Sequence, residues 1–231
     1  MEITPELEKK LELLQAKYSG LGQDLMSYLD GLLYADVTTY WDYIELDTLL
    51  SLQKPKTRFP DEVVFIMYHQ ITELYFKLSL REFKQLGEKA DIDKLFFIER
   101  VSRINRYFEA LIKSFEIMIE GMEREQFLKF RMSLLPASGF QSGQYREIEI
   151  YSTDFINLVA KDKRTNFDSE SSIREMIEHI YWKEGATEVE SGKKTLTLTQ
   201  FEDKYLESFI SLGENCKKNN LWQVYLTLNK K

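Results

Sequence analysis

The sequence predicts an all-α protein, and three observations lead to this fold class. The chain of 231 residues contains only ten glycines and four prolines, the residue types that most often interrupt helices. Residues 60–87 form one long, largely apolar segment with helix-type ends. From Phe97 to Met122, apolar residues recur in alternating steps of four and three, the spacing of a helix packed in a bundle. This length allows one large or two small domains, and we expect a single helical domain over residues 1–231.

Residues 60–87 are the centre of the predicted fold. Pro60 suits the first turn of a helix, and Gly87 offers a left-handed closing residue. A helix that is apolar on nearly every side is expected to lie buried inside a domain. The segment contains His69, with Phe65 one turn earlier on the same face. By itself this histidine is most simply a neutral core imidazole bonded to a nearby carbonyl or carboxylate, and a functional role is the alternative.

Composition limits the partners that the protein is expected to have. The formal net charge is −7 and no basic cluster stands out, so nucleic acid and anionic membranes are not expected partners. No apolar run approaches the roughly 20 residues of a membrane span. A single cysteine, Cys216, allows no internal disulfide, and with no signal peptide at the start we expect a cytoplasmic protein.

The N-terminal part carries two amphipathic helical patterns within residues 1–33. Such helices pack either on their own core or across a neighbouring subunit, and periodicity alone does not distinguish the two. They are followed by the aromatic residues Tyr40, Trp41 and Tyr43. Aromatic clusters of this kind usually fill a core or an interface.

Residues 124–151 change from a short helix into a loop and back. Pro136 and Gly139 interrupt the helix, and small polar residues surround them. Loops of this composition inside helical proteins often line sites. Arg131 is a planar double donor that suits a carboxylate ligand, but an ion pair with a glutamate of this acidic protein is the simpler explanation.

The C-terminal part is expected to contain a small β-hairpin near residues 187–199. Thr199 and Glu202 then form a capping box for the helix that follows. The only other histidine, His179, is expected to be a surface or half-buried residue.

The sequence lacks the common motifs of phosphate-binding, redox and metal-binding sites. It contains no glycine-rich phosphate loop, no Cys-x-x-Cys and no His-Glu-x-x-His motif. A zinc site with three histidine ligands is excluded because the chain has two histidines. The residues alone therefore indicate a helical protein whose pocket combines His69, Arg131 and aromatic side chains.

Three sequence blocks nevertheless resemble one family. They are TYWDYIELDTLLSLQ (residues 39–53), DEVVFIMYHQITELYFKLSLREF (61–83) and FRMSLLPASGFQSGQYREIE (130–149). In order, spacing and composite motifs they are similar to the tryptophan 2,3-dioxygenases. The resemblance implies a mostly helical, cytosolic homotetramer with haem b between its helices. It also implies the conversion of L-tryptophan and O2 to N-formylkynurenine.

The resemblance also implies roles for individual residues. His69 matches the distal histidine that accepts a hydrogen bond from the indole N–H, and Phe65 matches the aromatic residue that packs on the indole. Arg131 matches the arginine that binds the substrate carboxylate. The other matched positions are Phe127 in the substrate pocket, Ser138 and Gly139 in the loop over the distal haem face, and Tyr40 and Tyr43, which an adjacent subunit lends to the pocket. The helices within residues 1–33 are accordingly expected to contact that neighbour.

One feature of the family has no counterpart in this sequence. The family's haem iron is held by a histidine on a helix near the C-terminus, and no histidine follows His179 here. His179 lies before that position in chain order, so we assign it no role at the metal. Two explanations remain: the C-terminal part is missing from this chain, which is then expected to be inactive as it stands, or this homologue does not hold haem in the usual way.

Two rival functions therefore stay open. The first is a related haem enzyme that acts on a modified indole or another aromatic amino acid. The second is a haem-free helical protein that keeps the pocket for binding or assembly.

Overall fold

The structure is a computed structural model that describes residues 3–35, 38–89, 91–134, 139–168, 170–186 and 194–230. Within these ranges the regular structure is helical apart from isolated β-bridges, one of which pairs Val159 with Ile180 in antiparallel fashion. The all-α fold class is therefore confirmed. The chain divides into two compact units, Met1–Leu52 and Gln53–Lys231. The expected single domain over residues 1–231, with residues 1–33 against a neighbouring subunit, stays a prediction.

The first unit consists of short helices with little buried surface. Thr4 caps its first helix by accepting a hydrogen bond from the backbone N–H of Leu7, and Asp24 caps the second. Among the described residues of this unit, Leu25 is the one buried side chain. The helices are α1 (Pro5–Gly20), α2 (Leu25–Tyr34), α3 (Tyr40–Tyr43) and α4 (Leu46–Leu50).

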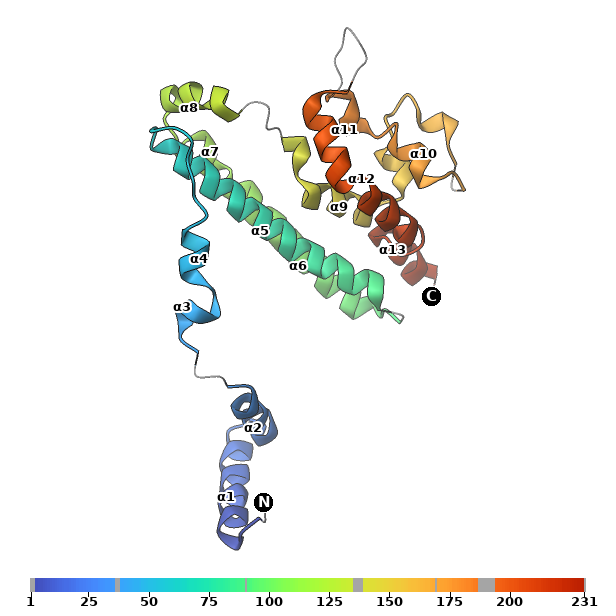
Figure 1. Ribbon diagram of the computed structural model, residues 1–231. Coiled ribbons are helices and arrows are strands. Elements are labelled where there is room, and N and C mark those ends of the chain that lie inside the picture. The colour runs from blue at the N-terminus through green and yellow to red at the C-terminus, as the bar shows by residue number, and fades with distance from the viewer. Residues whose placement is uncertain are drawn as a thin grey trace. The chain divides into compact units, whose positions relative to one another are not determined.

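The second unit is built on two long helices, α5 (Asp61–Glu88) and α6 (Lys94–Ser114), which lie side by side (Figure 1). Helix α9 (Gly143–Ser152) packs against α5 and connects this pair to α12 (Leu196–Cys216). The shorter helices are α7 (Glu116–Ile119), α8 (Arg124–Phe130), α10 (Ile173–Ile177), α11 (Tyr181–Glu184) and α13 (Leu221–Lys230). Single turns of 3-10 helix are η1 (Arg131–Leu134), η2 (Gly139–Gln141), η3 (Phe155–Leu158) and η4 (Arg164–Asn166).

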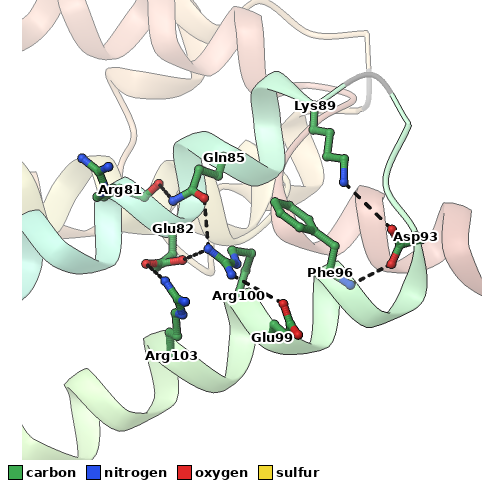
Figure 2. A network of polar contacts seen from close by, with 9 residues as sticks. All are labelled: Arg81, Glu82, Gln85, Lys89, Asp93, Phe96, Glu99, Arg100 and Arg103. Carbon is green, nitrogen blue, oxygen red and sulfur yellow. Dashed lines mark hydrogen bonds and ion pairs between the residues drawn. The ribbon is translucent and has the colours of Figure 1, made fainter. Parts of the chain in front are cut away.

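Helices α5 and α6 are joined by a buried ionic network (Figure 2). The carboxylate of Glu82 on α5 lies 3.0 Å from Nη1 of Arg100 and 3.4 Å from Nη1 of Arg103, both on α6. Gln85 accepts a further hydrogen bond from Arg100 at 3.0 Å. The Glu82 side chain is only 3% exposed, so this carboxylate depends on its partners on α6.

Two hydrophobic clusters hold the second unit together. The smaller one joins α5, α6 and α9 through Leu80, Phe83, Ile104 and Ile148. The larger one lies between α9, α10 and α12, where Gly213 permits a close approach. A side-chain carbon at Gly213 would lie 2.7 Å from Ile173 Cγ2, so only glycine fits there without a shift. The larger cluster comprises Ile150, Phe155, Leu158, Val159, Ile173, Met176, Ile177, Ile180, Trp182, Ala186, Leu198, Phe201, Phe209, Ile210 and Cys216.

The prediction of a hairpin near residues 187–199 is wrong at its C-terminal end. Helix α12 begins at Leu196 and includes Thr199, while residues 187–193 lie outside the described part of the chain. The capping residue is Thr195, which accepts a hydrogen bond from the backbone N–H of Leu198. The predicted capping box at Thr199 is therefore misplaced by one helical turn.

Two further predictions about the long helices need correction. Helix α5 continues through Gly87 to Glu88, and its final cap, Lys89, has a φ of −78° rather than a left-handed conformation. The apolar pattern that continues beyond α6 is divided at Phe115, where α7 begins as a separate turn.

The prediction that α5 is buried on nearly every side is wrong along one face. Met67, Ile71, Leu74 and Leu78 are 39–49% exposed in the chain by itself. Their spacing of four, three and four residues places them in one stripe along the helix. An apolar composition does not reveal which element covers each face of a helix.

Candidate active site around His69

His69 lies on α5, and a local hydrogen bond fixes its imidazole ring. Its Nδ1 is 2.8 Å from the backbone oxygen of Phe65, one turn earlier. A carbonyl oxygen only accepts, so Nδ1 carries the proton, and Nε2 of the neutral ring is left as an acceptor. The interpretation of a histidine bonded to a carbonyl is thus confirmed, but the side chain is exposed rather than buried in the core.

Three phenylalanine rings gather beside this imidazole. The ring centroid of Phe65 lies 4.1 Å from that of His69 and 6.3 Å from that of Phe127. Phe130, which is completely buried, lies 5.9 Å from Phe65 and 5.5 Å from Phe127. The sequence blocks that contain His69 and Phe130 therefore meet in one aromatic cluster, which Phe127 joins.

Helix α8 is held against the beginning of α5 by Asp61. The carboxylate of Asp61 accepts a hydrogen bond from the backbone N–H of Glu123 at 2.6 Å. The backbone N–H of Asp61 donates in return to the side chain of Gln126 at 3.3 Å. This pair of bonds fixes the first turn of α8, and with it the direction from which Phe127 approaches Phe65.

A first cavity of about 540 Å³ lies between α5 and α9, and we call it the α5–α9 cavity. That volume is in the range of small-molecule sites. Its walls combine aromatic and apolar side chains with a few polar groups. The lining residues are Phe65, His69, Thr72, Glu73, Phe76, Leu134, Gly139, Gln141, Ser142, Tyr145 and Arg146.

Arg146 is the cationic group of the α5–α9 cavity. Its side chain is 7% exposed, and its Nη1 lies 2.9 Å from both the Glu149 carboxylate and the Tyr181 hydroxyl. Its Nε is buried and has no hydrogen-bond partner among the described residues. Burial raises the pKa of Glu149, although hydrogen bonding from Tyr181 and the charge of Arg146 oppose that shift.

A second cavity of about 430 Å³ lies on the other side of Phe65 and His69, and we call it the α5–α8 cavity. Apart from His69 and Arg124, its lining side chains are aromatic or aliphatic. They are Phe65, Tyr68, Phe115, Met118, Ile119, Met122 and Phe127. Since Phe65 and His69 line both cavities, they form the wall between them.

The structure brings some of the predicted site residues together and leaves others apart. Phe65, His69 and Phe127 meet at the α5–α8 cavity, and Gly139 lines the α5–α9 cavity. Arg131 is exposed on η1, with its guanidinium carbon 5.9 Å from the centre of the Phe127 ring, and it lines neither cavity.

The remaining predicted residues lie elsewhere. Tyr40 and Tyr43 are on α3 of the first unit and are 71% and 82% exposed. Ser138 falls outside the described residues. The functional roles given to these residues stay predictions.

Sequence reasoning overlooked two arginines that line the cavities, Arg124 and Arg146. Arg146 ends the motif GFQSGQYR and lies one turn after Ser142, so its position in the third sequence block was an available signal. Arg124 gave no such signal, because its place at a cavity depends on how α8 packs against α5.

We also tested whether these residues fit a haem group. The α5–α9 cavity offers aromatic walls for a flat macrocycle and Arg146 for its carboxylates. The second histidine, His179, lines neither cavity, and its ring lies 5.7 Å from that of Phe167. Among the described residues, no group of three or more histidine, cysteine or acidic side chains is arranged to bind a metal. The described residues would therefore offer haem apolar walls and a guanidinium, but no cluster of metal-binding side chains to hold its iron.

None of the helices in the described ranges combines the length and the apolar character needed to cross a membrane.

The fold and site define a class, namely all-α proteins in which a histidine and a phenylalanine one turn apart separate two aromatic-lined cavities. Residues 32–216 match the family model of tryptophan 2,3-dioxygenase. The chain belongs to this family. The expected resemblance is thereby confirmed.

Individual relatives agree with the family match. The tryptophan 2,3-dioxygenase of Ruegeria sp. (strain TM1040) is 38% identical over 122 residues, which cover 50% of this chain and 42% of that protein. The enzyme of the same name from Pseudomonas fluorescens is 38% identical over 117 residues, covering 50% and 41%. That from Bacillus anthracis is 40% identical over 112 residues, covering 48% and 40%. The chain thus spans about two-fifths of the length of these relatives.

Proposed function

We propose that this chain forms the substrate-binding part of a haem-dependent dioxygenase that converts L-tryptophan and O2 to N-formylkynurenine. The observation that carries the proposal is the free acceptor Nε2 of His69, held in the wall between two aromatic-lined cavities. Family membership supports the same reaction, because the relatives bear the name tryptophan 2,3-dioxygenase.

The proposed roles follow from the chemistry of the side chains. His69 Nε2 accepts the indole N–H, and Phe65 packs against the indole ring. Removing the apolar ring from water stabilises the complex by about 25 cal/mol for each Å² buried. Arg131 binds the substrate carboxylate through two parallel hydrogen bonds, which offsets the cost of taking that charge out of water.

Haem b is the proposed cofactor, and when bound it supplies the oxygen chemistry of the reaction. The α5–α9 cavity is the proposed location, since Gly139 and Arg146 lie in its lining. The resemblance to the family assigns Ser138 to the haem pocket as well. The protein's own contribution is to orient the indole and to exclude water from the reacting face.

Self-association is the proposed source of the remaining pocket residues. The first unit exposes Leu33 by 82%, Tyr34 by 86% and Tyr43 by 82%. So much exposed apolar surface favours contact with another copy, as expected for a homotetramer that shares Tyr40 and Tyr43 between subunits. The cytoplasmic location expected from the sequence stays a prediction.

The test is a titration of the purified chain with haemin, followed by its absorption spectrum with and without L-tryptophan. Imidazole is added as an external nitrogen ligand for the iron, because the described residues offer no cluster of metal-binding side chains. We expect tight haem uptake in the presence of imidazole and a spectral change on addition of L-tryptophan. The change should be lost in Phe65→Ala, while haem uptake persists.

Failure of haem uptake, even with imidazole, would contradict the dioxygenase proposal and favour a haem-free binding or assembly protein. A spectral response to other indoles, but not to L-tryptophan, would instead indicate an oxygenase with a different substrate.

A further inference from the structure

A buried guanidinium lines the α5–α9 cavity, and a side chain from outside the cavity holds it. Arg146 on α9 contributes this group. Its Nη1 donates a hydrogen bond of 2.9 Å to the hydroxyl of Tyr181, the first residue of α11. Tyr181 does not line the cavity, so any effect that it has on a ligand there passes through Arg146.

The contacts among Arg146, Tyr181 and Glu149 form a closed network. The Tyr181 hydroxyl accepts a hydrogen bond from Arg146 and donates its own proton to the Glu149 carboxylate. The other oxygen of that carboxylate forms an ion pair with Nη1 of Arg146 at 2.9 Å. Each of the three groups thus contacts the other two. A connected network of this kind fixes the orientation of its members.

Tyr181 is itself anchored through the residue that follows it. Trp182 is buried in the larger hydrophobic cluster. Its ring stacks on that of Phe140, with 6.2 Å between the centroids, and meets the ring of Phe201 on α12 edge-on at 5.5 Å. The core therefore sets the position from which α11 presents the Tyr181 hydroxyl to Arg146.

The network leaves part of the guanidinium unused. Nη1 of Arg146 makes both contacts, whereas Nε is buried and has no hydrogen-bond partner among the described residues. A buried N–H without a partner is destabilising, so such a donor indicates a place for a ligand. The guanidinium carbon lies 4.8 Å from the ring centre of Tyr145, which also lines the cavity. An anionic group in the cavity would supply the partner.

We propose that Tyr181 is a positioning residue, which holds the guanidinium of Arg146 so that its remaining donors bind a carboxylate of haem in the α5–α9 cavity. This inference rests on the proposed function for the identity of the ligand. It adds the residue outside the cavity on which the carboxylate contact depends.

The experiment measures the affinity of the full chain for haemin and for haemin dimethyl ester, in which both carboxylates are blocked. Imidazole is present in every titration. The variants are Tyr181→Phe, Arg146→Gln and the two combined, and binding of the ester also shows that each variant is folded. Tyr225→Phe is the matched control, because Tyr181 and Tyr225 are both 43% exposed and Tyr225 lines neither cavity.

We expect Arg146→Gln to weaken haemin binding by roughly 10- to 100-fold through loss of a charged hydrogen bond. Tyr181→Phe should weaken it by roughly 3- to 10-fold, since the guanidinium stays but loses its support. Binding of the ester should change by less than about twofold in both variants, and Tyr225→Phe should resemble the unaltered chain. Once Arg146 is replaced, Tyr181→Phe should have no further effect on haemin.

A second measurement needs no haem. The Nε–H of Arg146 gives a signal in a nitrogen–proton correlation NMR spectrum, and Arg146→Gln identifies that signal by its loss. We expect a sharp signal in the unaltered chain and in Tyr225→Phe. In Tyr181→Phe the signal should broaden or shift, because the guanidinium is less tightly held.

The inference is overturned if Tyr181→Phe leaves the Nε signal unchanged, or weakens binding of haemin and its ester equally. Equal affinity of the unaltered chain for haemin and its ester would remove the carboxylate contact, but it would leave haem uptake and the proposed function intact. Failure of the unaltered chain to take up either form would overturn both.

Discussion

At the scale of single residues, the orientation of the His69 ring determines which of its nitrogens a ligand can reach. A sequence motif can mark His69, but the direction of its lone pair depends on the bond between Nδ1 and the Phe65 carbonyl. Because donor and acceptor belong to the same helical turn, the geometry of α5 alone determines which ring nitrogen is available. The acceptor is therefore prepared before any ligand binds.

Cys216 provides a residue-scale prediction about reactivity. It is the only cysteine of the chain, it is 6% exposed, and burial raises the pKa of its thiol to about 11. Since the thiolate is the reactive form, we expect the folded protein to resist a thiol reagent at pH 8. Labelling should become fast in denaturant, which mass spectrometry would record at one site. Rapid labelling of the folded chain would contradict this burial.

The same scale shows what the sequence can and cannot reveal about the site. The positions of Phe65 and His69 on one face follow from helical spacing, so they were predictable. Arg124 and Arg146 were missed because their places at the cavities depend on packing between α5, α8 and α9, which local pattern does not encode. Arg131 illustrates the opposite case, since a matching motif gave it a role while it lines neither cavity, and that role stays a prediction.

At the scale of elements, α5 and α6 depend on the buried carboxylate of Glu82. We expect Glu82→Ala to lower the free energy of unfolding by about 3–5 kcal/mol, because the buried Arg100 would lose its one buried carboxylate partner among the described residues. Glu99→Ala is the control, since this side chain is 54% exposed and lies 3.6 Å from Arg100, and it should cost less than about 1 kcal/mol. Urea unfolding followed by circular dichroism measures both. Similar losses of unfolding free energy in the two variants would show that the energy of these ion pairs does not depend on burial.

The starts of α5 and α12 show why the helices were easier to predict from the sequence than the absence of a strand. The start of α5 was visible because Pro60, Asp61 and Glu62 are typical of a first turn. The segment TLTLT, residues 195–199, led to the wrong prediction of a strand. Its alternating threonine and leucine also fits a helix, because Thr195 caps α12 and Leu198 is buried. Strand-like alternation over five residues cannot outweigh the burial that Leu198 and Phe201 gain on α12.

At the scale of the whole molecule, the first unit has too small a core to explain its own stability. It comprises 52 residues, and Leu25 is its one buried side chain among those described. Units of this size are marginal even with a well-formed core. This unit is therefore expected to gain stability from contact with another protein surface, and the second copy of the chain put forward under Proposed function would supply one.

This leads to a prediction about assembly. We expect the double substitution Leu32→Glu and Leu33→Glu to shift the chain toward the monomer, because both side chains are highly exposed leucines on α2. Analytical ultracentrifugation over a range of concentrations would measure the shift. Glu8→Gln and Glu12→Gln together form the control, since they alter exposed residues of α1 and remove charge rather than apolar surface. An unchanged mass distribution in the leucine variant would exclude this surface from the interface.

The bond between His69 and the Phe65 carbonyl has one more consequence. The acceptor is a backbone oxygen, so replacing the side chain at position 65 does not remove the bond. In Phe65→Ala the imidazole keeps its orientation, while the aromatic ring whose centroid lies 4.1 Å away is lost. The two contributions of this one residue, its carbonyl and its ring, can therefore be separated by mutation.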